Sequence, residues 1–194
     1  SINDWYFGDA DYDYPMGNIQ MTGKTRGAIM KGYAPLETFL MPNWSMDEIA
    51  AHALDFWITT EDLPDPNNRV TIDAAGHIHL NYTVNNQTSA NRLWGRLQGV
   101  LDKLYLKKHL VERQIYVKNP MGLSAIGHQA GTCRFGTDPS TSVLDVNCKA
   151  HELDNLYVVD TSFFPSIGAV NPSLTAIANA IRVGHHLKER LTVA

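Results

Sequence analysis

The C-terminal part of the chain constrains the fold most, because an apolar run leads through a loop into one long amphipathic helix. The run from Leu156 to Asp160 is typical of a strand buried on both faces. After a loop over residues 161–170, Asn171 suits the cap of a helix, and Pro172 suits its first helical position. We therefore expect a helix from Pro172 to about Leu191. Its apolar stripe comprises Leu174, Ile177, Ala178 and Ile181.

The middle of the chain combines helix and strand patterns. Residues 45–48 form a capping box, which predicts a helix over about 46–54, and residues 56–60 indicate a strand. The runs 69–72 and 77–82 alternate apolar and polar residues around a turn, which predicts a β-hairpin. The expected buried face of this hairpin comprises Val70, Ile72, Ile78, Leu80 and Tyr82.

A second amphipathic helix is expected from about Ala90 to Leu106, with Thr88 or Ser89 as its cap. Its buried positions are Leu93, Leu97, Val100, Leu101 and Leu104. Residues 1–43 show neither a helical nor a strand period, so we do not expect them to form a domain alone. These patterns together predict an α+β fold.

Composition narrows the class of partner. With 194 residues, 44% hydrophobic and 19% charged, the chain is long and apolar enough to bury a core. A formal net charge of −4 and the lack of a dense Lys/Arg run argue against nucleic acid or an anionic membrane, which leaves small molecules. No apolar run reaches the roughly 20 residues of a membrane span, so we expect a soluble protein of unknown compartment.

Two polar residues are candidates for chemistry. His128 lies in a glycine-rich segment that does not suit an ordinary helix, and loop histidines serve either structure or acid–base catalysis. Asn171 is either only a helix cap or part of a site, because the free N–H groups of a helix N-terminus favour negative charge. The residue types alone leave both alternatives open.

Longer segments around these two residues resemble the C-terminal signature of the glucose–methanol–choline (GMC) flavin oxidoreductases. The resemblance is specific from Gly127 to Gly136 and from Leu156 to Pro165, followed by Asn171-Pro172 and the predicted helix. Weaker similarity covers Asn3 to Asp9, Leu63-Pro64 and Asn68 to Val70. The resemblance implies a substrate-binding region over residues 1–120, with an antiparallel or mixed sheet and helices. Residues 121–194 would be a flavin-contacting segment that completes an FAD-binding α/β domain.

The resemblance also implies roles for individual residues. His128 would accept the hydroxyl proton of an alcohol or sugar while a hydride passes to flavin N5. Asn171 would be the second catalytic residue, and its amide orients a substrate oxygen but does not titrate. The flavin contacts would come from Asp160, Thr161, Asn171, Pro172, Ser173 and Leu174.

One departure from the family pattern affects the expected partner. The dinucleotide fingerprint G-x-G-x-x-G does not occur in these residues. We therefore expect the FAD-binding N-terminal half to come from elsewhere in a longer polypeptide or from a separate chain.

Three functions remain open at this stage. The first is an FAD-dependent alcohol or sugar oxidoreductase, the second a lyase of the hydroxynitrile lyase type with a structural flavin, and the third a fragment that binds sugar or a partner without turnover. A metal site is not expected, because His77 and His79 lack a cysteine or carboxylate at ligand spacing, and Cys133 and Cys148 lack the spacing of a zinc site.

Overall fold

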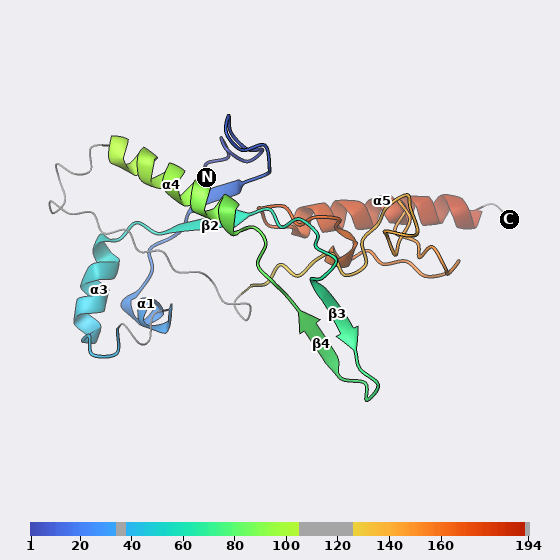
Figure 1. The fold of residues 1–194 in the computed structure, drawn as a ribbon, viewed down its shortest axis with the longest axis horizontal. Coiled ribbons are helices and arrows are strands. Elements are labelled where there is room, and N and C mark those ends of the chain that lie inside the picture. Colours follow the sequence, from blue (N-terminus) through green and yellow to red (C-terminus); the bar gives the residue numbers. More distant parts are fainter. Residues whose placement is uncertain (34–37, 105–125, 193–194) are drawn as a thin grey trace. The chain divides into compact units, whose positions relative to one another are not determined.

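The structure is a computed structural model that describes residues 1–33, 38–104 and 126–192. The chain divides into two compact units (Figure 1). The first unit comprises residues 1–59 and 89–125, and the second comprises residues 60–88 and 126–194. The regular elements of the described residues are small two-stranded sheets and separate helices, which confirms the α+β class. The predicted division near residue 120 remains a prediction.

The core of the first unit lies between a short sheet and one helix. Strand β1 (Gly17–Met21) pairs with strand β2 (Phe56–Thr60), which confirms the predicted strand. Helix α4 (Gln87–Lys103) contributes Leu93 and Leu97 to a buried cluster with Met16 and Ile19. Strand β1 lies within residues 1–43, where the sequence shows no sustained period, because β1 is short and its register depends on a distant partner.

Helices α1 (Gly27–Tyr33) and α3 (Asn43–His52) form the other part of the first unit. Helix α3 begins three residues before the predicted helix start at about residue 46, and Pro42 holds the cap position. The Ser45 hydroxyl donates to the Pro42 carbonyl at 2.8 Å, while Asp47 accepts the Gly27 N–H of α1 at 3.1 Å. The other side chain of the predicted capping box, Glu48, lies with its carboxylate 3.5 Å from His52 Nδ1, so the predicted capping box was wrong.

Helix α4 also begins earlier than predicted. Ser89 is buried inside the helix, where its hydroxyl donates to the Pro15 carbonyl at 3.2 Å and contacts the Tyr12 hydroxyl at 3.0 Å. It ties the helix to the N-terminal segment, so its predicted role as a cap was wrong. Leu93 and Leu97 are buried as predicted, whereas Leu104 is exposed, and the expected last turn at 105–106 lies outside the described residues.

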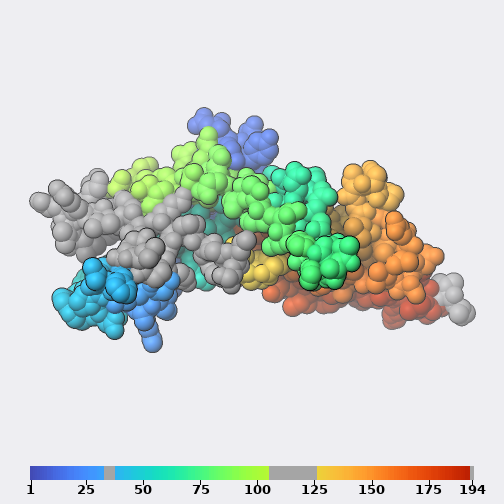
Figure 2. Space-filling model, turned by 60° about the horizontal axis from the view of Figure 1, so that its bottom comes forward, coloured from blue at the N-terminus to red at the C-terminus, as the bar shows by residue number. Residues whose placement is uncertain are grey.

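The second unit contains the predicted hairpin. Strands β3 (Arg69–Ile72) and β4 (Ile78–Asn81) pair antiparallel, with Val70 opposite Leu80 and Ile72 opposite Ile78. The turn is tight, because Gly76 has a φ of +87°. The predicted buried face was wrong: the hairpin lies at the surface (Figure 2), and the Ile78 side chain is 75% exposed. None of the described residues covers that face.

The run from Leu156 to Asp160 does not form the predicted strand. It makes one isolated antiparallel bridge, between Lys149 and Tyr157, and both Leu156 and Val159 are exposed. A strand buried on both faces needs neighbours on each side, and the described residues provide one short neighbour only. The side chains that do form the core of this unit are Leu144, Cys148, Ala150, Phe163 and Val183.

Helix α5 (Ser173–Thr192) completes the second unit. The Pro172 carbonyl accepts the Ala176 N–H at 3.0 Å, so Pro172 rather than Asn171 holds the cap position. Val183 faces the core with 1% of its surface exposed, whereas Leu174 and Ile181 of the predicted stripe are 79% and 58% exposed. The stripe exists, but the helix buries its opposite face. No helix within the described ranges is long and apolar enough to span a membrane.

Candidate active site

A short helix, η3 (Thr161–Phe163), is the fixed point of the candidate site. The Asp160 carboxylate caps it by accepting the Ser162 N–H at 2.8 Å. Phe163 is buried in the core and stacks on Phe164, with ring centroids 4.5 Å apart. The cap and the buried ring together fix the backbone of η3.

The glycine-rich segment that follows His128 runs beside η3. The Thr161 hydroxyl donates to the Gln129 carbonyl at 2.8 Å, and the Cys133 N–H donates to the Ser162 carbonyl at 3.0 Å. Gly131 has a φ of +81°, and a Cβ there would lie 3.3 Å from the Phe164 carbonyl oxygen. Glycine therefore suits both the conformation and the close approach at this position.

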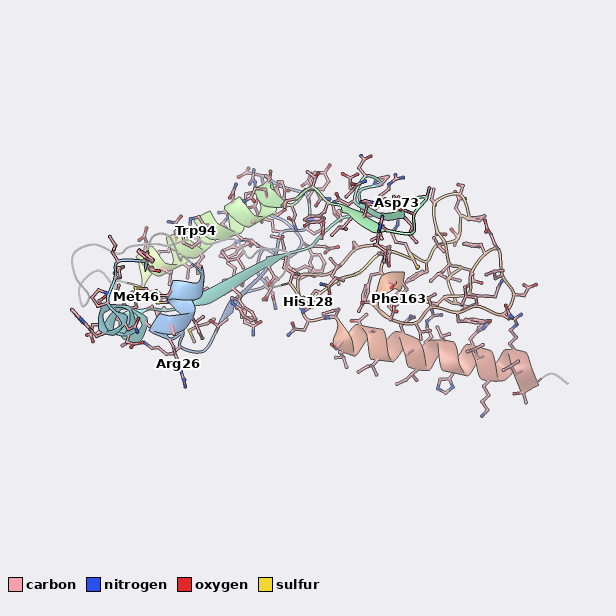
Figure 3. All side chains as sticks on the ribbon, turned by 90° about the horizontal axis from the view of Figure 1, so that it is seen from below. Arg26, Met46, Asp73, Trp94, His128 and Phe163 are labelled. Carbon is pink, nitrogen blue, oxygen red and sulfur yellow. The ribbon has the colours of Figure 1, made fainter. Side chains whose placement is uncertain are left out.

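The structure thus attaches the residue after His128 to the short helix that precedes the Asn171 loop (Figure 3). The His128 side chain is half-buried, and that of Asn171 is exposed at the start of α5. Among the described residues, no hydrogen bond joins these two side chains. The segments lie on one scaffold, and the catalytic pairing of His128 with Asn171 remains a prediction.

Some of the residues predicted to contact the flavin already have hydrogen-bond partners, whereas others are exposed. The Ser162 side chain and its backbone N–H both bond to Asp160 and hold the pKa of that carboxyl below its ordinary value. The Asp160 carboxylate is thus already used to cap η3, and the Thr161 hydroxyl is used to bond the Gln129 carbonyl. By contrast, Ser173 and Leu174 are exposed in the first turn of α5, where backbone N–H groups have no partner within the helix. Free N–H groups at a helix N-terminus favour negative charge, whereas the described residues form no enclosed cradle for a dinucleotide.

Sequence reasoning missed a contact between the hairpin base and the Asn171 loop. Asp62 and Ile167 form an antiparallel bridge, and the Ser166 hydroxyl donates to the Glu61 carboxylate at 2.8 Å. Burial raises the pKa of Asp62, despite an opposing hydrogen bond from the Asn85 side chain. Two acidic residues directly after a strand were the only signal, and nothing in the sequence pointed to a loop a hundred residues away.

Two histidines of the hairpin contact the carboxylate of Asp73. His77 Nδ1 and His79 Nε2 each lie 3.1 Å from Asp73 Oδ2. Hydrogen bonds, first from the His79 ring and then from the His77 backbone, lower the pKa of Asp73 to about 2. Within the described parts of the chain, no group of three or more His, Cys, Asp or Glu side chains has the arrangement of a metal site.

Comparisons with known proteins place these segments in a family. Residues 46–180 match the family model described as GMC oxidoreductase, in its C-terminal part. The chain is 45% identical over 64 residues to 6'''-hydroxyparomomycin C oxidase of Streptomyces lividus, which covers 33% of this chain and 12% of the relative. It is 51% identical over 55 residues to paromamine 6'-oxidase of Streptomyces fradiae, or 28% of this chain and 10% of the relative.

A longer match reaches C-glycoside 3-oxidase of Arthrobacter globiformis, with 38% identity over 86 residues, or 44% of this chain and 16% of the relative. The chain therefore matches between a tenth and a sixth of the length of these three relatives. The family model, in contrast, spans well over half of the chain and includes both His128 and Asn171. This chain belongs to the GMC oxidoreductase family, whose members use a flavin.

Proposed function

We propose that this chain is the C-terminal part or subunit of an FAD-dependent oxidoreductase that oxidises an alcohol or sugar hydroxyl to a carbonyl. The observation that carries the proposal is the Thr161–Gln129 hydrogen bond. Through it, the His128 segment and the loop that leads to Asn171 share one fixed support, the buried ring of Phe163. The segment after His128 and the loop before Asn171 are thereby attached to the same scaffold, which supports the proposal.

Each residue has a role that follows from its chemistry. His128, with a neutral ring, accepts the proton of the substrate hydroxyl. The Asn171 amide hydrogen-bonds the substrate oxygen and orients the carbon that is oxidised, without gaining or losing a proton. The first turn of α5, at Ser173 and Leu174, directs its free N–H groups toward negative charge. FAD supplies the hydride acceptor when it is bound.

The apolar faces of the second unit support a second half that binds FAD. One contiguous stripe on α5 is exposed in this chain, at Leu174, Ile177 and Ile181, and Leu156 and Val159 in the preceding run are exposed as well. Exposed contiguous apolar surface is typical of an interface. The chain carries no dinucleotide fingerprint, so we propose that this surface packs on the half that does.

The substrate class follows the relatives. Their names describe enzymes that act on paromamine, on 6'''-hydroxyparomomycin C and on C-glycosides. A dehydrogenase of 2-methyl-1,2-propanediol is also among them, which extends the class to simple alcohols. We propose a hydroxylated ring or a small alcohol as the substrate of this protein.

The test is the rate at which substrate bleaches the flavin of the complete protein in an anaerobic stopped-flow instrument. Loss of a general base costs about 10² to 10⁴ in rate, so His128→Ala should retain FAD and be reduced more slowly by that factor. His52→Ala, which removes an exposed histidine of the first unit, is the control and should change little. Normal reduction in the His128 variant would remove the assignment, and a wild type that no alcohol or sugar bleaches would favour a lyase.

A further inference from the structure

Asp62 carries a buried carboxylate oxygen that the proposed mechanism does not use. Within the described residues, Asp62 Oδ1 is inaccessible to solvent and has no hydrogen-bond partner. Such an atom lowers the stability of the fold, and burial accordingly raises the pKa of this carboxyl. Destabilising groups of this kind are concentrated at functional sites, which directs attention to what Asp62 contacts.

Asp62 lies against the middle of the loop that ends at Asn171. Its N–H donates to the Ile167 carbonyl at 3.0 Å, and the Ile167 N–H donates back to the Asp62 carbonyl at 3.2 Å. The neighbouring Glu61 accepts from the Ser166 hydroxyl. One end of the loop is fixed by the buried ring of Phe163, and Asn171 follows four residues after Ile167. The Glu61-Asp62 segment thus holds the middle of the loop, four residues before Asn171.

The side chain of Asp62 connects this bridge to the base of the hairpin. The Asn85 side chain hydrogen-bonds to the carboxyl of Asp62 and also donates to the Leu63 carbonyl at 2.9 Å. The Asn86 side chain donates to the Glu61 carbonyl at 3.4 Å. Two backbone bonds to Ile167 would form with any residue at position 62. The carboxyl adds a connection that fixes the segment, and with it the loop, to the hairpin.

We propose that Asp62 is a positioning residue for Asn171, acting by fixing the loop from Phe164 to Val170 to the base of the β3–β4 hairpin. The inference rests on the proposed function, because it gives Asp62 a role only if Asn171 orients the substrate. Displacement of a catalytic group by about 1 Å costs roughly 100-fold in rate. Loss of the Asp62 side chain should therefore slow the chemical step through Asn171, while the fold and flavin binding persist.

The experiment uses the flavin-loaded complete protein and measures anaerobic flavin reduction over a range of substrate concentrations. We expect Asp62→Ala to lower the limiting rate by about 10- to 100-fold, with a much smaller change in the concentration at half-maximal rate. Asp62→Asn keeps a polar partner for Asn85 without a charge and should restore most of the rate. Asp65→Asn is the matched control, because among the described residues the Asp65 carboxylate bonds only within its own turn, to the Asn67 N–H.

A double-mutant cycle separates positioning from a general structural role. In an Asn171→Ala background, Asp62→Ala should change the rate by no more than about twofold, since the group through which it acts is gone. Melting temperature and flavin content show whether each variant is folded. A full independent effect of Asp62→Ala in that background would overturn the inference, as would a wild-type rate in folded Asp62→Ala. If Asn171→Ala alone reduces normally, the proposed function fails instead.

Discussion

Helix α5 offers a direct test of the fold, because the face that the structure buries lies opposite the apolar stripe that the sequence predicts to be buried. Val183 lies in the core and Ile181, two residues earlier, is largely exposed. Replacing Val183 by Ala removes two buried methyl groups, at about 0.8 kcal/mol each, and leaves a cavity that adds roughly 1 kcal/mol. The better helix propensity of Ala offsets about 0.5 kcal/mol of this cost. We expect a net loss of about 2 kcal/mol.

The matched substitution Ile181→Ala should behave differently. Its side chain is more than half exposed, so the lost burial and the gain in helix propensity nearly cancel, within about 0.5 kcal/mol. The losses in free energy of unfolding expected for Val183→Ala and Ile181→Ala therefore differ by more than about 1 kcal/mol.

Hydrogen exchange of the α5 amides, measured by mass spectrometry on residues 1–194, reports the stability of this helix directly. The expected loss corresponds to exchange about 30-fold faster in Val183→Ala, against little change in Ile181→Ala. Equal or larger acceleration in Ile181→Ala would refute the orientation of α5. In the complete flavoprotein, where we propose that the stripe is covered, Ile181→Ala should instead become destabilising.

Two further predictions concern stability. Burial raises the pKa of Asp62 in the folded state above its ordinary value of 3.8. The protonated carboxyl therefore adds its full contribution to the free energy of unfolding below pH 3.8, and this contribution is lost as the pH rises through the raised pKa. Asp62→Asn should thus melt higher than wild type at neutral pH, with the gap closing in acid, and a lower melting temperature at neutral pH would contradict this. Gly8 has a φ of +111°, and a Cβ there would lie 2.2 Å from the Tyr12 carbonyl, so Gly8→Ala should cost about 1–3 kcal/mol in urea unfolding followed by tryptophan fluorescence. Gly23→Ala, with open space around it, is the control, and equal stability of the two variants would contradict the geometry.

The sequence predicted elements whose signals are local. The β3–β4 hairpin was found from alternation over a few residues, strand β2 from the short run over residues 56–60, and α5 from its helical period. The buried faces predicted for the hairpin and for α5 were wrong, because burial depends on what packs against an element. The stripe with Leu174 and Ile181 is apolar enough to be buried, and the described residues place the core on the other side of the helix.

The candidate site likewise has a part that local motifs predict and a part that depends on distant contacts. His128 and Asn171 stand out through the motifs around them, and the family model includes both. The Thr161–Gln129 bond joins residues 32 positions apart, and the Glu61–Ser166 bond joins residues 105 positions apart. Contacts of such separation depend on the whole fold, so neither the support for His128 nor the attachment of the Asn171 loop could be inferred from local patterns.

The central claim is that this chain provides the reacting groups of a flavin enzyme, while the flavin cradle comes from another part of the protein. Its most direct test is the FAD content of residues 1–194 purified alone and purified with a half that carries the dinucleotide fingerprint. Visible absorption near the flavin maximum and the released FAD give this content. We expect no retained FAD in the chain alone and stoichiometric FAD in the combined protein. Stoichiometric FAD in residues 1–194 alone would contradict the claim.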